Sequence, residues 1–379
     1  MTVKGNTPSS THPPLLPTSE DDIFHGLRLL RSRRVGISTY KRLLIEHGTA
    51  QNALAALPQV ARAAGVRNYD LCPEDVIHKE IAAGRAMGAR LLAQDDPDYP
   101  QLLNDIADAP PFLWVLGDVN LLKKPMISLV GARNASSLGT RMAKSLATNL
   151  GEAGYVIVSG LARGVDAAAH TAALPHGTIA VQAGGVDVMY PAENTELALS
   201  IAANGLRISE MPMGLQPMAR HFPNRNRIIS GLSKATIVVE AAAKSGSLIT
   251  ARDALDQGRD VLAVPGHPFD ARAAGCNMLI RDGAVLVRGA KDVIDAIAPL
   301  APCQSSQADL PLPKAKADLR DTSELHMQIL SRLGPSPLAE DQLIRDLKTS
   351  AAKVTPVLLD LELDGRIARR DGGLLAKAE

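Results

Sequence analysis

One stretch of the chain gathers basic residues that could bind phosphate. Residues 214–234 contain four cations and no Asp or Glu, in a chain with 41 basic residues, 40 acidic residues and a formal net charge of +1. The cations of this stretch are Arg220, Arg225, Arg227 and Lys234. Because the net charge gives no global attraction to anions, an anion site must be local. Guanidinium groups offer a planar fork of donors that fits phosphate, so we predict contacts from Arg225, Asn226 and Arg227.

A second candidate anion site is the segment SGSLIT at residues 245–250, with Lys244 directly before it. The first N–H groups of a helix have no intrahelical partner, and they bind anions readily where glycine permits close approach. We predict an anion site formed by Lys244, Ser245, Gly246, Ser247 and Thr250. The alternative is a serine that merely caps the helix.

Two further glycine-rich segments follow apolar runs. The segment LVGARNASSLG places Gly131 and Arg133 after the first run, and it matches neither GxGxxG nor GxxxxGK[ST], which argues against a dinucleotide fold or an NTPase. In SGLARGVDAAAH, Gly160 and Gly164 allow tight turns.

The acidic residues and histidines give little support for catalysis. In SGLARGVDAAAH we expect Asp166 to cap the following helix and His170 to pack inside it, although either could be catalytic. Asp187 has no evident partner for a carboxylate pair or a triad, and Glu210 and Glu240 are similarly isolated; Glu240 could hydrogen-bond backbone or orient an arginine. Three scattered cysteines with no CxxC argue against structural zinc or a disulfide framework and suit a reducing cytoplasm. We expect no cofactor and no metal.

Regular alternation of short apolar runs with helix-length segments predicts the elements that position these residues. Runs of four to six apolar residues, most followed by Gly or Ser and then a helix, are typical of an α/β fold with a doubly wound parallel sheet. The predicted strands are 126–131, 155–160, 178–183, 207–211, 236–241, 260–264 and 284–287. Predicted helices include 138–153, 194–203, 224–232 and 247–257.

This fold has a consequence for the cations. Ligands of such sheets bind beyond the carboxyl ends of the strands, where Arg133, Arg225, Arg227 and Lys244 should converge. Several cations around a glycine-lined hollow fit a polyanionic chain better than a single metabolite. One Trp, five Tyr and four Phe make a base-stacking platform improbable, so contacts should be to backbone, with little sequence preference and strong salt dependence. The alternative is that these arginines pair with acids on neighbouring elements.

The remainder of the chain predicts smaller units around this core. Residues 1–20 read as a disordered leader, 21–94 as a helical domain of the SAM or helix-hairpin-helix type, 95–298 as the core, 299–322 as a linker and 323–379 as a winged helix with its wing turning at 371–373. Trp114 is expected in the core. Both terminal domains could contact DNA or pack against protein, and Arg369 and Arg370 could touch phosphate or stay solvated. No apolar run reaches the length of about 20 residues that crosses a membrane.

The sequence also resembles a known family. The segments SGLARGVDAAAH, GGVDVMYPAEN, SEMPMG, FPNRNRIISGLS, VVEAAAKSGSLITA, GRDVLAVPG and GCNMLIRDGA are similar, in this order, to the signature of the DprA/Smf family (DNA-processing protein A) over residues 95–290. The third-strand loop reads AGG where the family usually has a GxG-type triplet.

This resemblance implies an extended Rossmann-like core with a helical SAM-like domain before it and often a winged helix after it. It further implies a cytoplasmic, non-enzymatic protein, usually a homodimer, that binds single-stranded DNA without sequence preference. Such a protein protects incoming strands in natural transformation and loads the RecA recombinase on them. The motif arginine then corresponds to Arg133, the RNR arginines to Arg225 and Arg227, and the SGSLIT segment to residues 245–250. An alternative is a nucleotide-binding enzyme like the phosphoribohydrolases of the lysine-decarboxylase-like type, although these need a PGGxGT-type loop. A partner-docking scaffold is a third reading.

Overall fold

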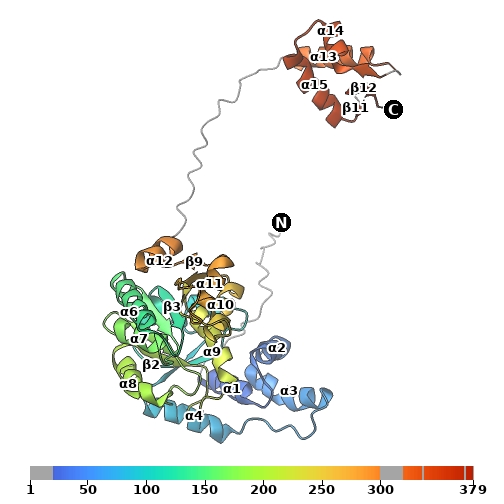
Figure 1. Ribbon diagram of the computed structural model, residues 1–379. Coiled ribbons are helices and arrows are strands. Elements are labelled where there is room, and N and C mark those ends of the chain that lie inside the picture. The colour runs from blue at the N-terminus through green and yellow to red at the C-terminus, as the bar shows by residue number, and fades with distance from the viewer. Residues whose placement is uncertain (1–19, 299–318, 335–336, 371–372, 379) are drawn as a thin grey trace, which may run out of the picture. The chain divides into compact units, whose positions relative to one another are not determined.

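The structure is a computed structural model that describes residues 20–298, 319–334, 337–370 and 373–378. The chain divides into two compact units, residues 1–299 and 300–379 (Figure 1). The predicted leader apart from Glu20, most of the predicted linker and residues 371–372 of the predicted wing turn lie outside the described residues.

A nine-stranded sheet forms the centre of the first unit, in the order β1-β2-β6-β5-β4-β3-β7-β8-β9. Its strands are β1 (Arg90–Ala93), β2 (Phe112–Gly117), β3 (Met126–Gly131), β4 (Val156–Ser159), β5 (Thr178–Val181), β6 (Leu206–Ser209), β7 (Ala235–Val239), β8 (Asp260–Ala263) and β9 (Val285–Leu286). Strands β3 to β9 are parallel, whereas β2 pairs antiparallel with both β1 and β6. The predicted doubly wound sheet is confirmed.

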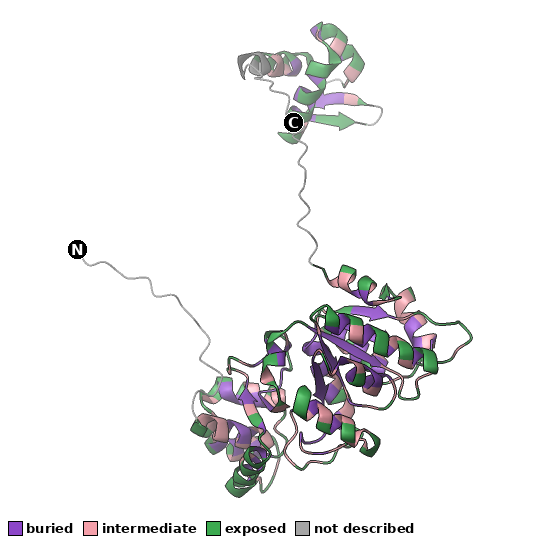
Figure 2. Cartoon of the chain, turned by 90° about the vertical axis from the view of Figure 1, so that its left-hand side faces the viewer, coloured by how far each residue is buried: buried purple, intermediate pink, exposed green. Residues whose placement is uncertain are grey.

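Helices cover both faces of this sheet because its central strands are apolar on both sides. Figure 2 shows the strands buried and the outer helix surfaces exposed. The helices of this region are α5 (Gln101–Asn104), α6 (Ser137–Glu152), α7 (Val165–Ala173), α8 (Thr195–Asn204), α9 (His221–Gly231), α10 (Ser247–Asp256), α11 (Ala274–Arg281) and α12 (Ala290–Ile297), with short 3₁₀ turns at 119–123 and 192–194. One apolar cluster joins the sheet to α9, α10 and α11, and another joins its other face to α6, α7 and α12.

Every predicted strand is present, with ends shifted by a few residues, but two strands were missed. β1 and β2 form an antiparallel pair on the β6 side of the sheet, so the sheet begins before the predicted core boundary at residue 95. A Pro-rich connection separates them, and β1 has only four residues, which hides the alternation that marks a strand. Trp114 in β2 is 2% exposed, as expected for a core residue.

Four helices build the N-terminal domain and pack onto the β1–β2 end of the sheet. They are α1 (Glu20–Arg31), α2 (Ile37–His47), α3 (Ala50–Ala63) and α4 (Glu74–Ala86). Their shared apolar cluster includes Phe112 of β2. The indole N–H of Trp114 donates to Glu80 at 2.8 Å, and Arg31 forms an ion pair with the same carboxylate at 2.9 Å. The predicted helical domain is confirmed, and this buried network fixes it to the core.

The second unit has the predicted winged-helix order. It contains α13 (Leu319–Arg332), β10 (Leu338–Ala339), α14 (Glu340–Leu347), α15 (Ala351–Leu363), β11 (Ile367–Arg370) and β12 (Leu374–Lys377), and the strands pair as β10-β12-β11. Its first helix begins at Leu319, inside the predicted linker. Arg369 on β11 forms an ion pair with Glu340 at 2.7 Å, whereas Arg370 is exposed. Among the described residues of the whole chain, no helix is long and apolar enough to span a membrane.

Candidate nucleic-acid interface

The crevice of the sheet opens where the strand order reverses around β3. The chain runs from β3 through β4 and β5 to β6 on one side, and then returns to place β7 on the other side of β3. Beyond the carboxyl ends of β3 and β7 lies a cavity of about 740 Å³, which we term the switch-point cavity. The predicted residues that line it are Gly131, Arg133, Arg225, Asn226, Lys244, Ser245, Gly246, Ser247 and Thr250. The structure therefore brings together the candidate residues of three separate segments.

Glycines shape the floor of this cavity. A Cβ at Gly131 would lie 1.9 Å from the carbonyl oxygen of Val239, so the end of β3 can meet β7 only through glycine. Gly164 has a φ of 74°, and a Cβ there would lie 2.3 Å from the carbonyl oxygen of Ala132. Neither position accepts a side chain, as the predicted shaping role requires.

Arg225 lies at the bottom of the cavity and is 5% exposed. Its Nη1 donates to the carbonyl oxygen of Val181 at 2.9 Å, and a Cβ at Gly160 would lie 1.7 Å from that Nη1. Burial lowers the pKa of Arg225 to about 10, against the opposing effect of Asp166. The guanidinium is therefore a fixed, buried cation at neutral pH.

Asp166 balances this cation and does not cap its helix, so that expectation was wrong. The N-cap residue of α7 is Gly164, with no side-chain cap bond, and the Asp166 carboxylate accepts from the backbone N–H groups of Gly160 at 3.1 Å and Ala162 at 3.3 Å. Burial raises the pKa of Asp166, and Arg225 opposes that rise. The carboxylate thus fixes the loop after β4.

His170 is a packed helix residue, as expected. Its Nδ1 lies 2.7 Å from the hydroxyl of Thr178, and its Nε2 accepts from the N–H of Leu161 at 3.3 Å. Burial, assisted by Arg225, lowers the pKa of His170 to about 3. The ring is therefore neutral at physiological pH. It does not line the switch-point cavity.

Besides Arg272, which is paired with Asp270 at 3.1 Å, the accessible cations that line the cavity are Arg133 and Lys244. Both are exposed, and neither forms an ion pair with any described residue. The Arg133 guanidinium lies 5.4 Å from the centroid of the Phe222 ring, a cation–π contact that positions it over the cavity mouth. Two unpaired cations therefore stand beside the buried Arg225 around this cavity.

The loop before α10 has features of both a serine-capped helix and an anion site, the two readings of the SGSLIT segment. The Ser245 hydroxyl accepts the N–H of Ser247 at 3.3 Å, as a plain cap would, and the Ser247 hydroxyl donates to the carbonyl oxygen of Gly131 at 3.0 Å. These bonds fix the loop against the end of β3. The N–H of Gly246 has no hydrogen-bond partner among the described residues, so it is available to an anion.

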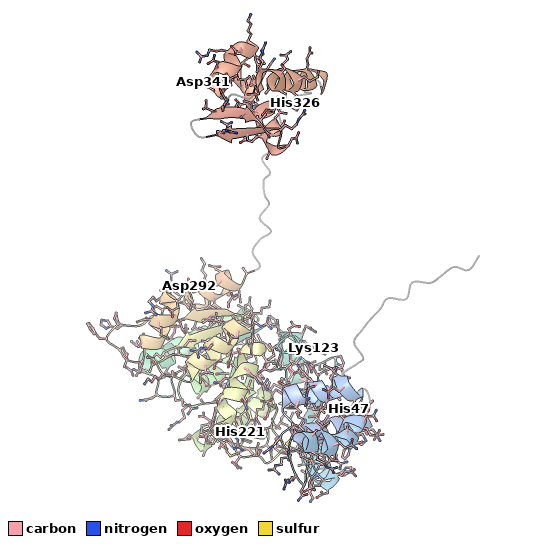
Figure 3. All side chains as sticks on the ribbon, turned by 90° about the vertical axis from the view of Figure 1, so that its right-hand side faces the viewer. His47, Lys123, His221, Asp292, His326 and Asp341 are labelled. Atoms are coloured by element: carbon pink, nitrogen blue, oxygen red, sulfur yellow. The ribbon has the colours of Figure 1, made fainter. Side chains whose placement is uncertain are left out.

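Arg227 does not line the cavity, contrary to the expectation that it converges there with Arg133, Arg225 and Lys244. The alternative, pairing with acids on neighbouring elements, holds for this arginine. Its Nη2 lies 2.5 Å from Glu210, and its Nε lies 3.3 Å from Asp108. Since α9 already begins at His221 (labelled in Figure 3), residues 225 and 227 are separated by about 200° around the helix. Glu210, which showed no partner in the sequence, is the partner of Arg227.

Glu240 also has a structural partner. Its carboxylate accepts from the N–H of Ser136 at 2.8 Å and from the Ser136 hydroxyl, and Gly139 leaves room for it because a Cβ there would lie 2.4 Å from the carboxyl carbon. Glu240 therefore braces the start of α6, in agreement with the expected backbone hydrogen bond. No cluster of three or more potential metal ligands occurs among the described residues.

Sequence reasoning missed the aromatic side of this region. A second cavity of about 320 Å³ adjoins the first, and it is lined by Tyr190 and Phe222 as well as by Arg133, Gly160 and Arg225. The two rings lie 5.8 Å apart. The low aromatic count hid them, although the spacing of Phe222 and Arg225, three residues apart on one helix, places both on the same face.

Three models of known protein domains match this chain. Residues 90–298 match the model of the DNA recombination-mediator protein A family, residues 20–83 match the DprA-like N-terminal HHH domain, and residues 313–373 match the DprA winged helix domain. The chain is 47% identical over 201 residues to DNA processing protein DprA of Streptococcus pneumoniae, covering 52% of this chain and 71% of that protein. It is 36% identical over 292 residues to Protein Smf of Escherichia coli, covering 75% of this chain and 76% of that protein.

Two solved structures are similar as well. The X-ray structure of DNA processing protein A from Streptococcus pneumoniae superposes with a TM-score of 0.62 at 35% identity, covering 74% of this chain and 98% of that one. The structure of DNA processing protein A from Helicobacter pylori, which concerns its single-stranded DNA binding mode, superposes with a TM-score of 0.51 at 31% identity, covering 55% of this chain and 95% of that one.

Proposed function

Because this chain belongs to the DprA/Smf family, with the DNA recombination-mediator protein A domain at residues 90–298, we propose that it binds single-stranded DNA in the switch-point cavity. We further propose that it acts in DNA processing during transformation, protecting the incoming strand and loading the RecA recombinase on it. The relative from Helicobacter pylori is described as binding single-stranded DNA, which supports the choice of ligand.

One observation carries the proposal: Arg133, Lys244 and the buried Arg225 line one cavity at the carboxyl edge of the sheet. Arg133 and Lys244 can each reach a phosphate, while Arg225 supplies a fixed positive charge at the floor. Asn226 and the free N–H of Gly246 add neutral donors. Contacts of this kind are made to the strand backbone, so binding should depend strongly on salt and little on sequence.

Family membership supports a proposal for the assembly and the setting. We propose a homodimer, in which two cavities grip one strand and gain effective concentration, and a cytoplasmic place of action, where the recombinase works. Arg227 belongs to the support of the site in this proposal and does not contact DNA, because Glu210 and Asp108 hold it.

A binding role explains the acids better than the phosphoribohydrolase alternative does. Asp166 accepts two loop N–H groups, Glu210 pairs with Arg227 and Glu240 binds Ser136, so each of the three has a structural task. Of the three, Asp166 lines the switch-point cavity, but its carboxylate is engaged by the N–H groups of Gly160 and Ala162. A ribosyl hydrolase needs an acid that is free to act on its substrate. We therefore propose that the protein does not act as an enzyme.

Salt-titrated binding of single-stranded and duplex DNA by Arg133→Ala and Lys244→Ala variants tests the proposal. Each variant should weaken single-strand binding about equally for different sequences, and each should reduce the slope of log K against log salt by about 0.7 per lost phosphate contact. Arg42→Ala on α2 is a matched control, since Arg42 is a half-exposed arginine remote from the cavity. Wild-type affinity and slope in both cavity variants would contradict the proposal.

A further inference from the structure

We propose that the bound strand continues from the switch-point cavity into a neighbouring groove, where Phe269 stacks on a base and Arg141 binds a phosphate. This inference rests on the proposed single-strand binding and extends its footprint. The groove, which we term the loop groove, has a volume of about 780 Å³ and lies between the first turns of α6 and the loop of residues 264–273 after β8.

The two hollows adjoin at one side chain. Arg272 lines both the switch-point cavity and the loop groove, so its side chain stands at the boundary between them. A strand whose phosphates contact Lys244 and Arg133 has this boundary as an adjacent exit. The other wall of the groove begins at Ser136 and Ser137, directly after the β3 loop that carries Arg133.

Phe269 is the most exposed large apolar side chain of the described residues, at 95%. The loop that carries it is nevertheless well ordered by hydrogen bonds. The amide of Asn277 donates to the carbonyl oxygen of Gly266 at 2.9 Å and accepts the N–H of Gly266 at 3.2 Å, and the N–H of Asp270 donates to the carbonyl oxygen of His267 at 2.9 Å. An aromatic ring held outward by an ordered loop is a suitable platform for a base, because every base has a face that can stack.

Among the arginines of the groove, Arg141 is the one available to a phosphate. It is exposed on α6, and it forms no ion pair with any described residue. Arg272 is paired with Asp270 at 3.1 Å, and Arg288 is paired with Asp292 (labelled in Figure 3) at 2.8 Å. The Glu240 carboxylate, which also lines the groove, is turned toward the N–H of Ser136.

These features favour a polyanionic strand over an apolar protein surface. Leu138 lines the groove and is 68% exposed, and Phe269 stands on the same loop as His267 and Asp270, which line the groove as well. A protein interface would need a wider apolar centre. One exposed ring, one unpaired guanidinium and an adjoining cavity with two more unpaired cations match the alternation of base and phosphate along a single strand.

The test measures affinity for thymidine oligonucleotides that lengthen one nucleotide at a time. Phe269→Ala and Arg141→Ala should bind the shortest ligands like the wild type and should lose roughly tenfold in affinity once the strand is long enough to reach the groove. Arg141→Ala should also lower the salt slope by about 0.7 for long strands alone. Leu199→Ala, which removes another exposed apolar side chain, and Arg62→Ala, which removes another exposed arginine, are the matched controls.

Two further measurements separate the possible failures. With 5-iodouracil in a long oligonucleotide, photocrosslinking should attach the label to the peptide that contains Phe269. If Arg133→Ala and Lys244→Ala weaken binding at every length while the two groove variants bind like the wild type at every length, the groove is not a DNA site and the proposed function stands. If none of the four variants changes binding, both proposals fail. A change in sedimentation mass with Phe269→Ala, without loss of DNA affinity, would assign Phe269 to contact with a second copy and would overturn the inference.

Discussion

At the scale of single residues, the candidate site depends on how a buried guanidinium is tolerated. Arg225 is 5% exposed, and its positive charge is offset by Asp166 and by the carbonyl oxygen of Val181. The absence of a side chain at Gly160 supplies the space. Since leaving a buried charge without its partners costs far more than an exposed ion pair contributes, these residues act as one unit.

Substitution of Gly160 tests this interdependence. Gly160→Ala should destabilise the protein by about 3 kcal/mol, because the new Cβ, only 1.7 Å from Nη1, displaces the guanidinium from its buried partners. In an Arg225→Ala background the same change should cost little, and urea unfolding of the four proteins gives the coupling between the two sites. Gly36→Ala, at a glycine with open space around it, is the control. Additive effects of the two substitutions would show that Gly160 does not serve Arg225.

At the scale of elements, helix α9 decides which predicted residues reach the cavity. Phe222, Arg225, Asn226 and Ile229 all line the switch-point cavity, and their spacing of three or four residues is that of one helix face. Arg227 lies on the opposite side, where Glu210 after β6 and Asp108 before β2 approach it. A motif that reads as one basic cluster in the sequence is thus divided between a binding role and a supporting role.

An alanine pair on this helix separates the two roles. Arg227→Ala should lower the free energy of unfolding by about 3 kcal/mol, since it leaves the largely buried Glu210 carboxylate without its ion-pair partner, while the folded variant keeps wild-type DNA affinity. Arg225→Ala should also destabilise the fold, because Asp166 loses its opposing charge, but its folded protein should bind DNA more weakly, as the floor of the cavity loses its charge. Urea denaturation and mobility shift on both variants provide the comparison. If Arg227→Ala leaves the stability intact and weakens DNA binding, Arg227 contacts DNA and the proposed supporting role is wrong.

The same helix shows what the sequence could and could not predict. Apolar runs and glycines predicted the parallel strands and the edge at which Arg133, Arg225 and Lys244 converge, because strand period and crossover topology are local properties. The partners of Arg227 and Glu240 were not predictable, since they come from elements that are distant in the sequence. The strands β1 and β2 were not predicted because they join the sheet through the pairing of β2 with β6, which is distant in the sequence. The role of Phe269 was not predicted because only the structure shows that its ring is exposed.

At the scale of the whole molecule, the chain consists of parts with separate cores. The winged helix has its own apolar cluster around Ile329, Leu343 and Leu358, and the sheet and the N-terminal domain have theirs. The N-terminal domain, in contrast, shares its cluster with Phe112 of the sheet. The first two parts should therefore unfold together, whereas the winged helix should be dispensable for the fold of the rest.

Deletion of residues 320–379 tests whether DNA is bound by the core or by the winged helix. The truncated protein should keep the unfolding transition of the core and bind single-stranded DNA within about twofold of the full chain, because every residue of the switch-point cavity precedes the deletion. On the winged helix itself, Arg369 is occupied by Glu340, and the exposed surface of α15 carries Lys353 and Asp360 beside the apolar Leu359 and Leu363. Such a helix offers a phosphate backbone little charge, which is why the affinity should remain in the core. Loss of binding by a truncation that retains the core transition would instead place the main DNA contact in the winged helix, and the cations at the sheet edge would then need another ligand.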